Sequence, residues 1–239
     1  MRSLLIAPAD EKRLGEALMS GADAVIVDLA GAAPAERAGA RTVAARFLKE
    51  ARGNRDGPVL IVRANALDSG ETDSDLDVVM AGAPDAILLL GSLGAASVQQ
   101  LSAKLAVREA DLSLADGVTR IIAVADTARS LFDMGSYRGS SARLTGIAWS
   151  AESLRADVGA ETDRNGRGDY AGPYRLARDL TLLAATSAGV PAIDAPFTDL
   201  RNAEGLRAEA LAARRGGFAG KMAVDPAQVG VINEIFPLQ

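Results

Sequence analysis

The chain contains no cysteine and no histidine among its 239 residues, and aromatic residues make up only 4% of it. The lack of cysteine excludes disulfides, thiolate metal sites and cysteine nucleophiles. The lack of histidine excludes Ser-His-Asp triads and imidazole-bound zinc, and it removes the commonest general base. Acid–base chemistry must therefore use carboxylates, lysine, tyrosine, water or the substrate, and a bound metal must be a hard ion held by oxygen, such as magnesium.

Positive charge is also outnumbered, because 26 lysines and arginines face 31 aspartates and glutamates, which gives a net charge of -5. An acidic surface repels phosphate backbones and anionic lipids, so we expect neither a nucleic-acid nor a membrane partner. The apolar run at the N-terminus is too short for a signal peptide or a membrane span, and no other stretch is long enough. The sequence predicts a soluble, cytoplasmic protein.

The chain does contain a regular alternation of short apolar runs and alanine-rich helical segments. The apolar runs are continuous, which is typical of parallel strands buried on both faces. The predicted strands span residues 3–7, 24–28, 59–65, 86–90, 120–124, 144–149, 191–195 and 218–224. Predicted helices include residues 34–52, 95–107, 170–188 and 201–215.

Eight strands alternating with helices in a chain of this length predict an α/β fold of the (β/α)8 TIM-barrel type. An open doubly wound sheet is the main alternative, but it usually has fewer strands and a glycine-rich first turn. Only PADEKR follows the first apolar run, without the glycine spacing of a phosphate-binding loop. We expect a single TIM-barrel domain over residues 1–239 with a short C-terminal helix, and an outer layer that is completed by homo-oligomerisation.

In a TIM barrel the functional side chains lie at the C-terminal ends of the strands. Asp126 and Glu152 follow neighbouring predicted strands, so their carboxylates could converge on one cation. Arg63 closes an apolar strand and therefore needs a partner, which a substrate carboxylate could supply through a bidentate contact. For each acid taken alone, a helix N-cap or a surface position is an alternative.

Two further segments predict features outside the strands. The polar, glycine-rich residues 159–169 are expected either to cover the barrel mouth or to form a solvated surface loop. The acidic residues 70–77 lack the spacing of a calcium-binding loop, so a solvated helix start is expected there.

Several segments, in this order, carry a resemblance to a known family: RSLLIAPA, GADAVIVDL, VRANALDSG, DTARSL, AWSAESLRADVG and GVPAIDAPFTDLRNAEGLRAEALAARRGGFAGKMAVDPAQVGVINEIF. Together they resemble the citrate lyase beta-subunit-like family of the HpcH/HpaI aldolase superfamily. The resemblance implies a TIM barrel with magnesium-dependent carbon–carbon lyase chemistry. It implies a 2-oxo acid, a 3-hydroxy acid or an acyl-CoA thioester as substrate, and a trimer or hexamer as the assembly.

The resemblance also implies roles for particular residues. The acid before TAR and the acid of a GAEDL-type motif hold magnesium in that family, and the arginine of an R-x-N strand end grips the substrate. The predicted metal site is therefore Asp126, Glu152 and Ser153. We predict Arg63 and Asp28 as catalytic residues, and Arg63, Asn65 and Asp194 as substrate-binding residues.

The chain departs from the family pattern at the positions where chemistry should occur. Acidic or basic family residues are replaced at Ala30, Gly31, Gly91, Leu93 and Ser153, and a histidine is replaced by Asp225. Loss of an anionic ligand should weaken magnesium binding, because a hard cation relies on charge. Two hypotheses follow: a divergent lyase, or a catalytically degenerate barrel that acts as a binding or subunit-partner protein.

Overall fold

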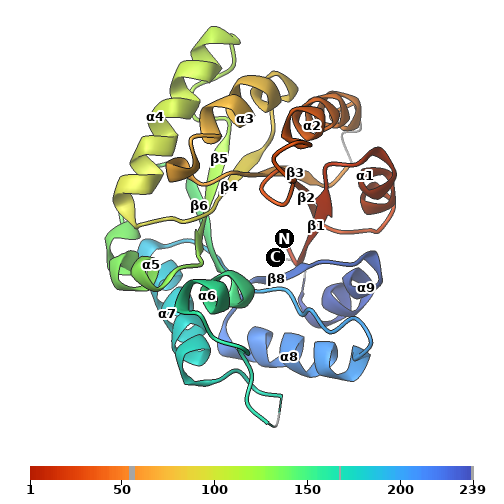
Figure 1. The fold of residues 1–239 in the computed structure, drawn as a ribbon, viewed down its shortest axis with the longest axis vertical. Coiled ribbons are helices and arrows are strands. Elements are labelled where there is room, and N and C mark those ends of the chain that lie inside the picture. The colour runs from red at the N-terminus through yellow and green to blue at the C-terminus, as the bar shows by residue number, and fades with distance from the viewer. Residues whose placement is uncertain (54–56, 167, 238–239) are drawn as a thin grey trace.

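The computed structural model describes residues 1–53, 57–166 and 168–237. Eight parallel strands close into one barrel in sequence order, with helices around it (Figure 1). The strands are β1 (Ser3–Pro8), β2 (Ala24–Asp28), β3 (Val59–Ala64), β4 (Ala86–Leu89), β5 (Arg120–Ala125), β6 (Leu144–Trp149), β7 (Ala192–Asp194) and β8 (Gly220–Ala223). All eight overlap the predicted runs, and the TIM-barrel prediction is confirmed.

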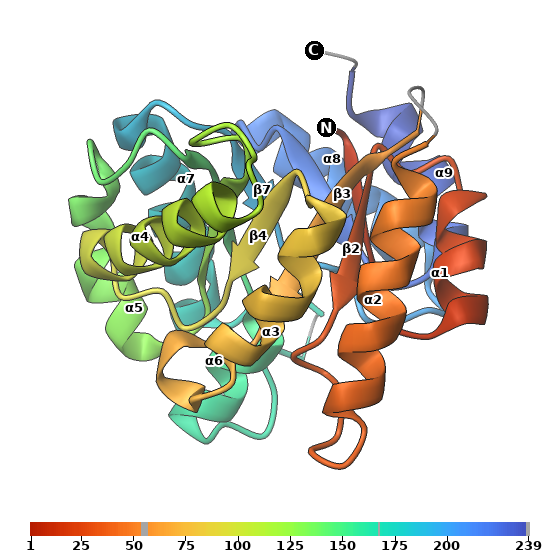
Figure 2. The same cartoon turned by 90° about the horizontal axis from the view of Figure 1, so that it is seen from above.

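The helices of the described part form the outer layer, and α2 and α3 lie side by side outside the strands (Figure 2). The α-helices are α1 (Glu11–Leu18), α2 (Arg37–Ala51), α3 (Thr72–Val79), α4 (Ala95–Asp111), α5 (Ala128–Asp133), α6 (Ala151–Val158), α7 (Gly172–Ala188), α8 (Ala203–Gly216) and α9 (Pro226–Ile235). Three 3-10 turns complete the set: η1 (Leu67–Ser69), η2 (Met80–Gly82) and η3 (Met134–Tyr137). None of the described helices has the length and apolar character that crossing a bilayer requires.

The strands are buried on both faces, as their continuous apolar sequences predict. Because side chains alternate along a strand, one set fills the barrel and the other packs under the helices. The barrel interior contains mainly aliphatic residues, among them Ile26, Ile61, Leu88, Ile122, Ile193 and Met222. Each such buried side chain stabilises the fold by about 1.5–3 kcal/mol.

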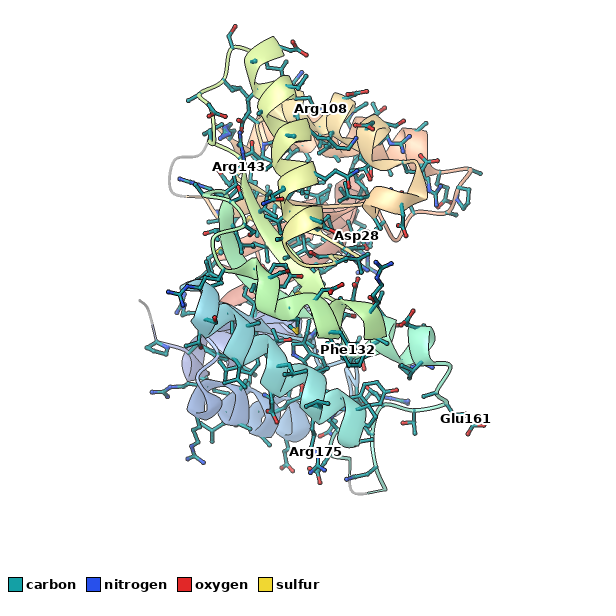
Figure 3. All side chains as sticks on the ribbon, turned by 90° about the vertical axis from the view of Figure 1, so that its left-hand side faces the viewer. Asp28, Arg108, Phe132, Arg143, Glu161 and Arg175 are labelled. Atoms are coloured by element: carbon teal, nitrogen blue, oxygen red, sulfur yellow. The ribbon has the colours of Figure 1, made fainter. Side chains whose placement is uncertain are left out.

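Ion pairs link neighbouring outer elements, and Figure 3 shows the side that carries α4 and α5. Arg108 of α4 pairs with Asp73 and Asp77 of α3, with nitrogen–oxygen distances of 2.9 and 2.6 Å. Near the N-terminal end of β6, both terminal nitrogens of Arg143 bind the buried Glu109 carboxylate at 2.7 Å. The Arg143–Glu109 contact lies at the starts of β5 and β6, opposite the strand ends that carry the predicted site.

The acidic segment 70–77 differs from its prediction. Asp75, in α3, is fully buried and pairs with Arg41 of α2 at 2.7 Å. Its other oxygen accepts hydrogen bonds from the backbone and side-chain nitrogens of Asn65, both at 2.8 Å. A solvated helix start is therefore wrong for Asp75, because this carboxylate ties α3 to the end of β3.

Candidate functional site

A cavity of about 250 Å³ opens at the C-terminal ends of the strands, and we call it the mouth cavity. Its floor is apolar and includes Leu88, Val124 and Met222. The polar lining comes from Asp28, Arg63, Ser150, Glu152 and Ser153. The placement agrees with the general position of active sites in TIM barrels.

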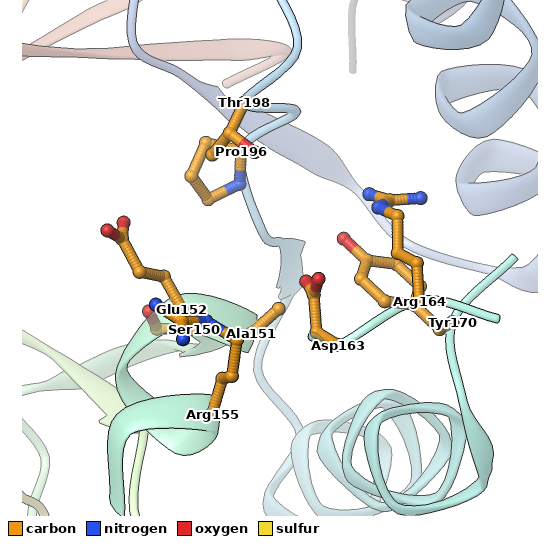
Figure 4. A pocket seen from close by; sticks show the side chains of 9 residues that line it. All are labelled: Ser150, Ala151, Glu152, Arg155, Asp163, Arg164, Tyr170, Pro196 and Thr198. Atoms are coloured by element: carbon orange, nitrogen blue, oxygen red, sulfur yellow. The ribbon is translucent and has the colours of Figure 1, made fainter. Parts of the chain in front are cut away.

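A second recess of about 150 Å³ adjoins the mouth cavity, and we call it the loop recess. The two share Ser150, Glu152 and Pro196. Figure 4 shows the Asp163 carboxylate between the Glu152 side of the recess and the stacked side chains of Arg164 and Tyr170. No sequence motif marks these residues as part of a site, although one of the two expectations for the polar segment 159–169 places it over the mouth.

Arg63 and Asp28 face each other because β2 and β3 pair in register at these two residues. Arg63 Nη1 lies 3.1 Å from Asp28 Oδ2, and the two side chains are 25% and 12% exposed. Asp28 Oδ1 accepts a hydrogen bond from the Gly31 amide at 3.1 Å. Within the described residues the bond to Asp28 is the one hydrogen bond of the Arg63 side chain, so its remaining N–H groups can reach a ligand.

Gly31 makes this arrangement of Asp28 possible. A Cβ atom at position 31 would lie 2.6 Å from Asp28 Oδ2, far inside van der Waals contact. A side chain at position 31 would therefore force the Asp28 carboxylate into another rotamer.

Asp126 follows β5 and is 5% exposed. Its two oxygens accept the Gly91 amide hydrogen at 3.0 and 3.2 Å. Burial raises the pKa of Asp126 to about 6, and the Gly91 hydrogen bond and the charge of Arg63 only partly oppose this. The alternative that Asp126 caps the next helix is wrong, because Thr127 caps α5 through the Ser130 amide. A buried acid without an adjacent cationic partner is a suitable ligand for a positive ion.

Ser150, Glu152 and Ser153 lie at the start of α6, directly after β6. The Ser150 hydroxyl oxygen accepts the Ser153 amide hydrogen at 3.2 Å and lies 3.0 Å from Ser153 Oγ. Glu152 is exposed, and no described residue forms a hydrogen bond with its carboxylate. The Ser150 amide donates to the Ala125 carbonyl at 3.2 Å, so the ends of β5 and β6 lie side by side.

Few side chains at the ends of β5 and β6 can bind a metal ion. In residues 1–53, 57–166 and 168–237, no three acidic side chains come close enough together to form a metal site on their own. Glu152 and Ser153 line the mouth cavity but Asp126 does not, and the Ser153 hydroxyl is already close to Ser150, so a metal site of these three residues stays a prediction. Magnesium commonly binds one or two carboxylates and completes its shell with water and substrate.

Asn65 and Asp194 line neither the mouth cavity nor the loop recess, and their place in the substrate site stays a prediction. The Asn65 amide group binds Asp75 and is 6% exposed. Asp194 is fully buried and forms an ion pair with Lys221 at 2.8 Å. The polar atoms of both side chains bind residues distant in the sequence, so Asn65 and Asp194 stabilise the fold.

Comparisons with known proteins agree with this architecture. A sequence model of the family described as HpcH/HpaI aldolase/citrate lyase matches residues 2–226. The chain belongs to the HpcH/HpaI aldolase/citrate lyase family. A relative, the (3S)-malyl-CoA thioesterase of Cereibacter sphaeroides, is 31% identical over 98% of this chain and 76% of its own length.

Two solved structures from Mycobacterium tuberculosis are similar to this member of the family. One is a citrate lyase beta subunit complexed with oxaloacetate and magnesium, with a TM-score of 0.82 and 29% identity over 99% of this chain and 96% of that one. The other is protein CitE in complex with magnesium, acetoacetate and coenzyme A. It has a TM-score of 0.80 and 30% identity over 100% of this chain and 81% of that one.

Proposed function

We propose that this family member is a magnesium-dependent carbon–carbon lyase that acts on an oxo or hydroxy acid or its CoA thioester. The observation that carries the proposal is that a cation and an acid line the same mouth cavity from different strands. Arg63 lines one side, and Glu152 lines the side formed after β6, next to the end of β5 where Asp126 lies. A related structure that spans 99% of this chain holds oxaloacetate and magnesium, which supports the choice of ligand.

Asp126 and Glu152 are the residues that would hold magnesium. They fit the ion because both are unpaired with cationic side chains among the described residues, and both offer hard oxygen donors. When bound, magnesium supplies Lewis-acid stabilisation of the enolate that forms as the carbon–carbon bond breaks. Ser153 lines the same cavity and would contribute at most a neutral oxygen or a bridging water.

The other side of the cavity would bind and orient the substrate. Arg63 presents its free N–H groups to a substrate carboxylate, and Asp28 holds the guanidinium in place at 3.1 Å. Asp28 Oδ2 is the acceptor that would take the hydroxyl proton of a 3-hydroxy acid during cleavage. The apolar floor formed by Leu88, Val124 and Met222 would keep bulk water from the enolate.

CoA dependence and assembly are also part of the proposal. The related CitE complex with coenzyme A supports a thioester as a substrate of this chain. A homo-oligomer, trimeric or hexameric, remains our expectation for the assembly. Sedimentation of the purified chain measures the assembly directly.

Calorimetric titration tests the proposed function. We expect the wild-type chain to bind magnesium at millimolar concentration, more tightly with oxaloacetate present. Asp126→Asn should abolish the magnesium heat, while the matched control Asp111→Asn, an exposed residue at the end of α4, should leave it unchanged. Absence of magnesium binding to the wild type, with and without oxaloacetate, would overturn the lyase proposal.

One observation favours a second function. No group of three acidic side chains in the described residues could hold a metal, and the family resemblance implies a lysine and a glutamate where this chain has Gly91 and Leu93. The alternative is therefore a catalytically degenerate barrel that binds a small acid or a subunit partner. This alternative would be supported by an experiment in which oxaloacetate binds to the mouth cavity without magnesium and is not turned over.

A further inference from the structure

A buried ion pair joins the last residue of β7 to the second residue of β8. Asp194 and Lys221 are paired in register, and both side chains are fully buried. Lys221 Nζ donates to Asp194 Oδ2 at 2.8 Å, to the Ala195 carbonyl at 2.6 Å and to Glu209 Oε1 at 2.8 Å. All three ammonium hydrogens therefore have acceptors, as a buried lysine requires.

Asp194 is bound from two further sides. Arg178 of α7 donates to both of its oxygens at 2.9 and 3.2 Å, and the Trp149 indole donates at 3.0 Å. Burial alone would raise the pKa of Asp194, but the charges of Lys221 and Arg178 hold it below the ordinary value. The carboxylate is thus ionised and fixed by three elements of the barrel.

Glu209 connects this pair to the loop recess. Its Oε1 accepts from Lys221, and its Oε2 accepts from Arg164 Nη2 at 2.8 Å. The Arg164 guanidinium lies 4.2 Å from the Tyr170 ring centre and donates to the Gly168 carbonyl at 2.9 Å. Both Arg164 and Tyr170 line the loop recess.

We propose that Glu209, fixed by Lys221, is a positioning residue that holds Arg164 and Tyr170 as the wall of the recess beside Glu152. The Glu209 carboxylate bridges two cations, Lys221 on β8 and Arg164 in the loop, so the barrel strand fixes the position of the loop. The recess opens onto the mouth cavity through Ser150, Glu152 and Pro196. Glu209 therefore controls the shape of the mouth without touching a ligand there.

Glu209→Gln separates positioning from stability. The glutamine oxygen can still accept from Lys221, but its NH₂ group then faces the Arg164 guanidinium, donor against donor. The matched control is Glu234→Gln, whose carboxylate pairs with Arg207 on an exposed surface at 2.6 Å. If Glu209→Gln fails to fold, Arg164→Met breaks the same contact from the loop side and leaves the Lys221–Glu209 bond intact.

Hydrogen exchange of the ligand-free protein is the first measurement. The Asn165 and Ala171 amides donate to the Asp169 and Asp163 carbonyls, both at 2.8 Å, and report the order of the loop. We expect exchange at these amides to accelerate at least tenfold in Glu209→Gln and to remain unchanged in Glu234→Gln. Unchanged exchange in both Glu209→Gln and Arg164→Met would overturn the proposal.

Tryptophan fluorescence is the second measurement, because Trp149 is the single tryptophan of the chain. Its ring packs edge to face on Tyr170 at 5.0 Å. We expect Glu209→Gln to shift the emission and increase acrylamide quenching, with circular dichroism unchanged. An unchanged emission and quenching would count against the positioning role.

The consequence for ligands rests on the proposed function and is measured separately. With magnesium and oxaloacetate, we expect KM to rise several-fold in Glu209→Gln while kcat changes little. A chain that binds no oxaloacetate would defeat the proposed function and leave the exchange and fluorescence results standing. Faster exchange with an unchanged KM would overturn the claim that the wall controls the mouth.

Discussion

Two ion pairs, one between β2 and β3 and one between β7 and β8, differ in burial. Asp28 and Arg63, at the ends of β2 and β3, are 3.1 Å apart and partly exposed. Asp194, at the end of β7, and Lys221, near the start of β8, are 2.8 Å apart and wholly buried. The exposed pair can exchange its partner for a ligand, whereas the buried pair cannot be opened without leaving a charge in the core. The Asp28–Arg63 pair, which lines the mouth cavity, is therefore available for chemistry, whereas the Asp194–Lys221 pair stabilises the fold.

The largest effect should follow from breaking the buried pair. Lys221→Met leaves Asp194 without its main counter-charge, and removing one partner of a buried pair costs about 3–5 kcal/mol. Arg207→Met is the control, because its pair with Glu234 is exposed and such pairs contribute about 0–1 kcal/mol. Urea unfolding measures both, and a loss below about 1 kcal/mol for Lys221→Met would contradict the structural role of the pair.

The exposed pair should show the opposite balance between stability and binding. Arg63→Met should change the unfolding free energy by less than about 1 kcal/mol, because the pair is partly solvated. Oxaloacetate affinity should fall by about one to two powers of ten, the usual effect of losing a charged hydrogen bond. Calorimetry measures the affinity, and Arg63→Lys, which keeps the charge without the planar fork, should fall between the two. Equal affinity in all three proteins would exclude Arg63 as the substrate anchor.

A third acid, Asp126, sharpens the comparison because it has neither the solvent access of Asp28 nor the cationic partners of Asp194. Its pKa is raised to about 6 by burial, so the folded state holds this proton more tightly than the unfolded state. Its contribution to stability is thus present below the unfolded pKa and is lost as the pH rises toward 6. The shift corresponds to at most about 3 kcal/mol.

Denaturation of the metal-free protein between pH 4 and 7 measures this contribution. The difference in unfolding free energy between wild type and Asp126→Asn should change across that interval and become constant above it. A difference independent of pH would show that the Asp126 pKa is ordinary. Magnesium should bind more weakly below pH 6, because it competes with the proton.

The smallest effect concerns the residue that permits the Asp28–Arg63 contact. A Cβ at Gly31 would meet Asp28 Oδ2 at 2.6 Å, so Gly31→Ala should turn Asp28 away and release Arg63. Gly39→Ala, inside α2 with no atom within 4 Å of the added Cβ, is the control and should stabilise the helix by about 0.5–1 kcal/mol. A crystal structure of Gly31→Ala with Asp28 unmoved would contradict this account.

The sequence predicts the barrel well because its strands are short continuous apolar runs that recur eight times. It also places Arg63, Asp28, Ser153 and Glu152 at the mouth, since each directly follows or ends a strand. Asp194 also ends a strand, but its side chain is buried because Lys221, Arg178 and Trp149 surround it. Those contacts join residues 16 to 45 positions apart, and no local pattern reveals them.

Asn65 and the loop recess show the same limitation. Asn65 is taken up by Asp75, ten residues later, because α3 turns this acid inward. The recess depends on Arg164 reaching Glu209 across 45 residues, so the sequence could mark the loop as polar but could not assign its contacts. Strand ends can be predicted from periodicity, whereas the partners of charged groups depend on how the ring closes.

The closure of that ring has a consequence for how the chain acquires its structure. β1 pairs with β8, so Ser3 and Lys221 are neighbours, and the Ser3 hydroxyl also donates to the Asn233 side chain at 2.8 Å. During synthesis on the ribosome, more than two hundred further residues must therefore be added before β8 can cover the second edge of β1. Until then the growing sheet has two open edges, which is the stage at which this protein is most exposed to mispairing with other chains.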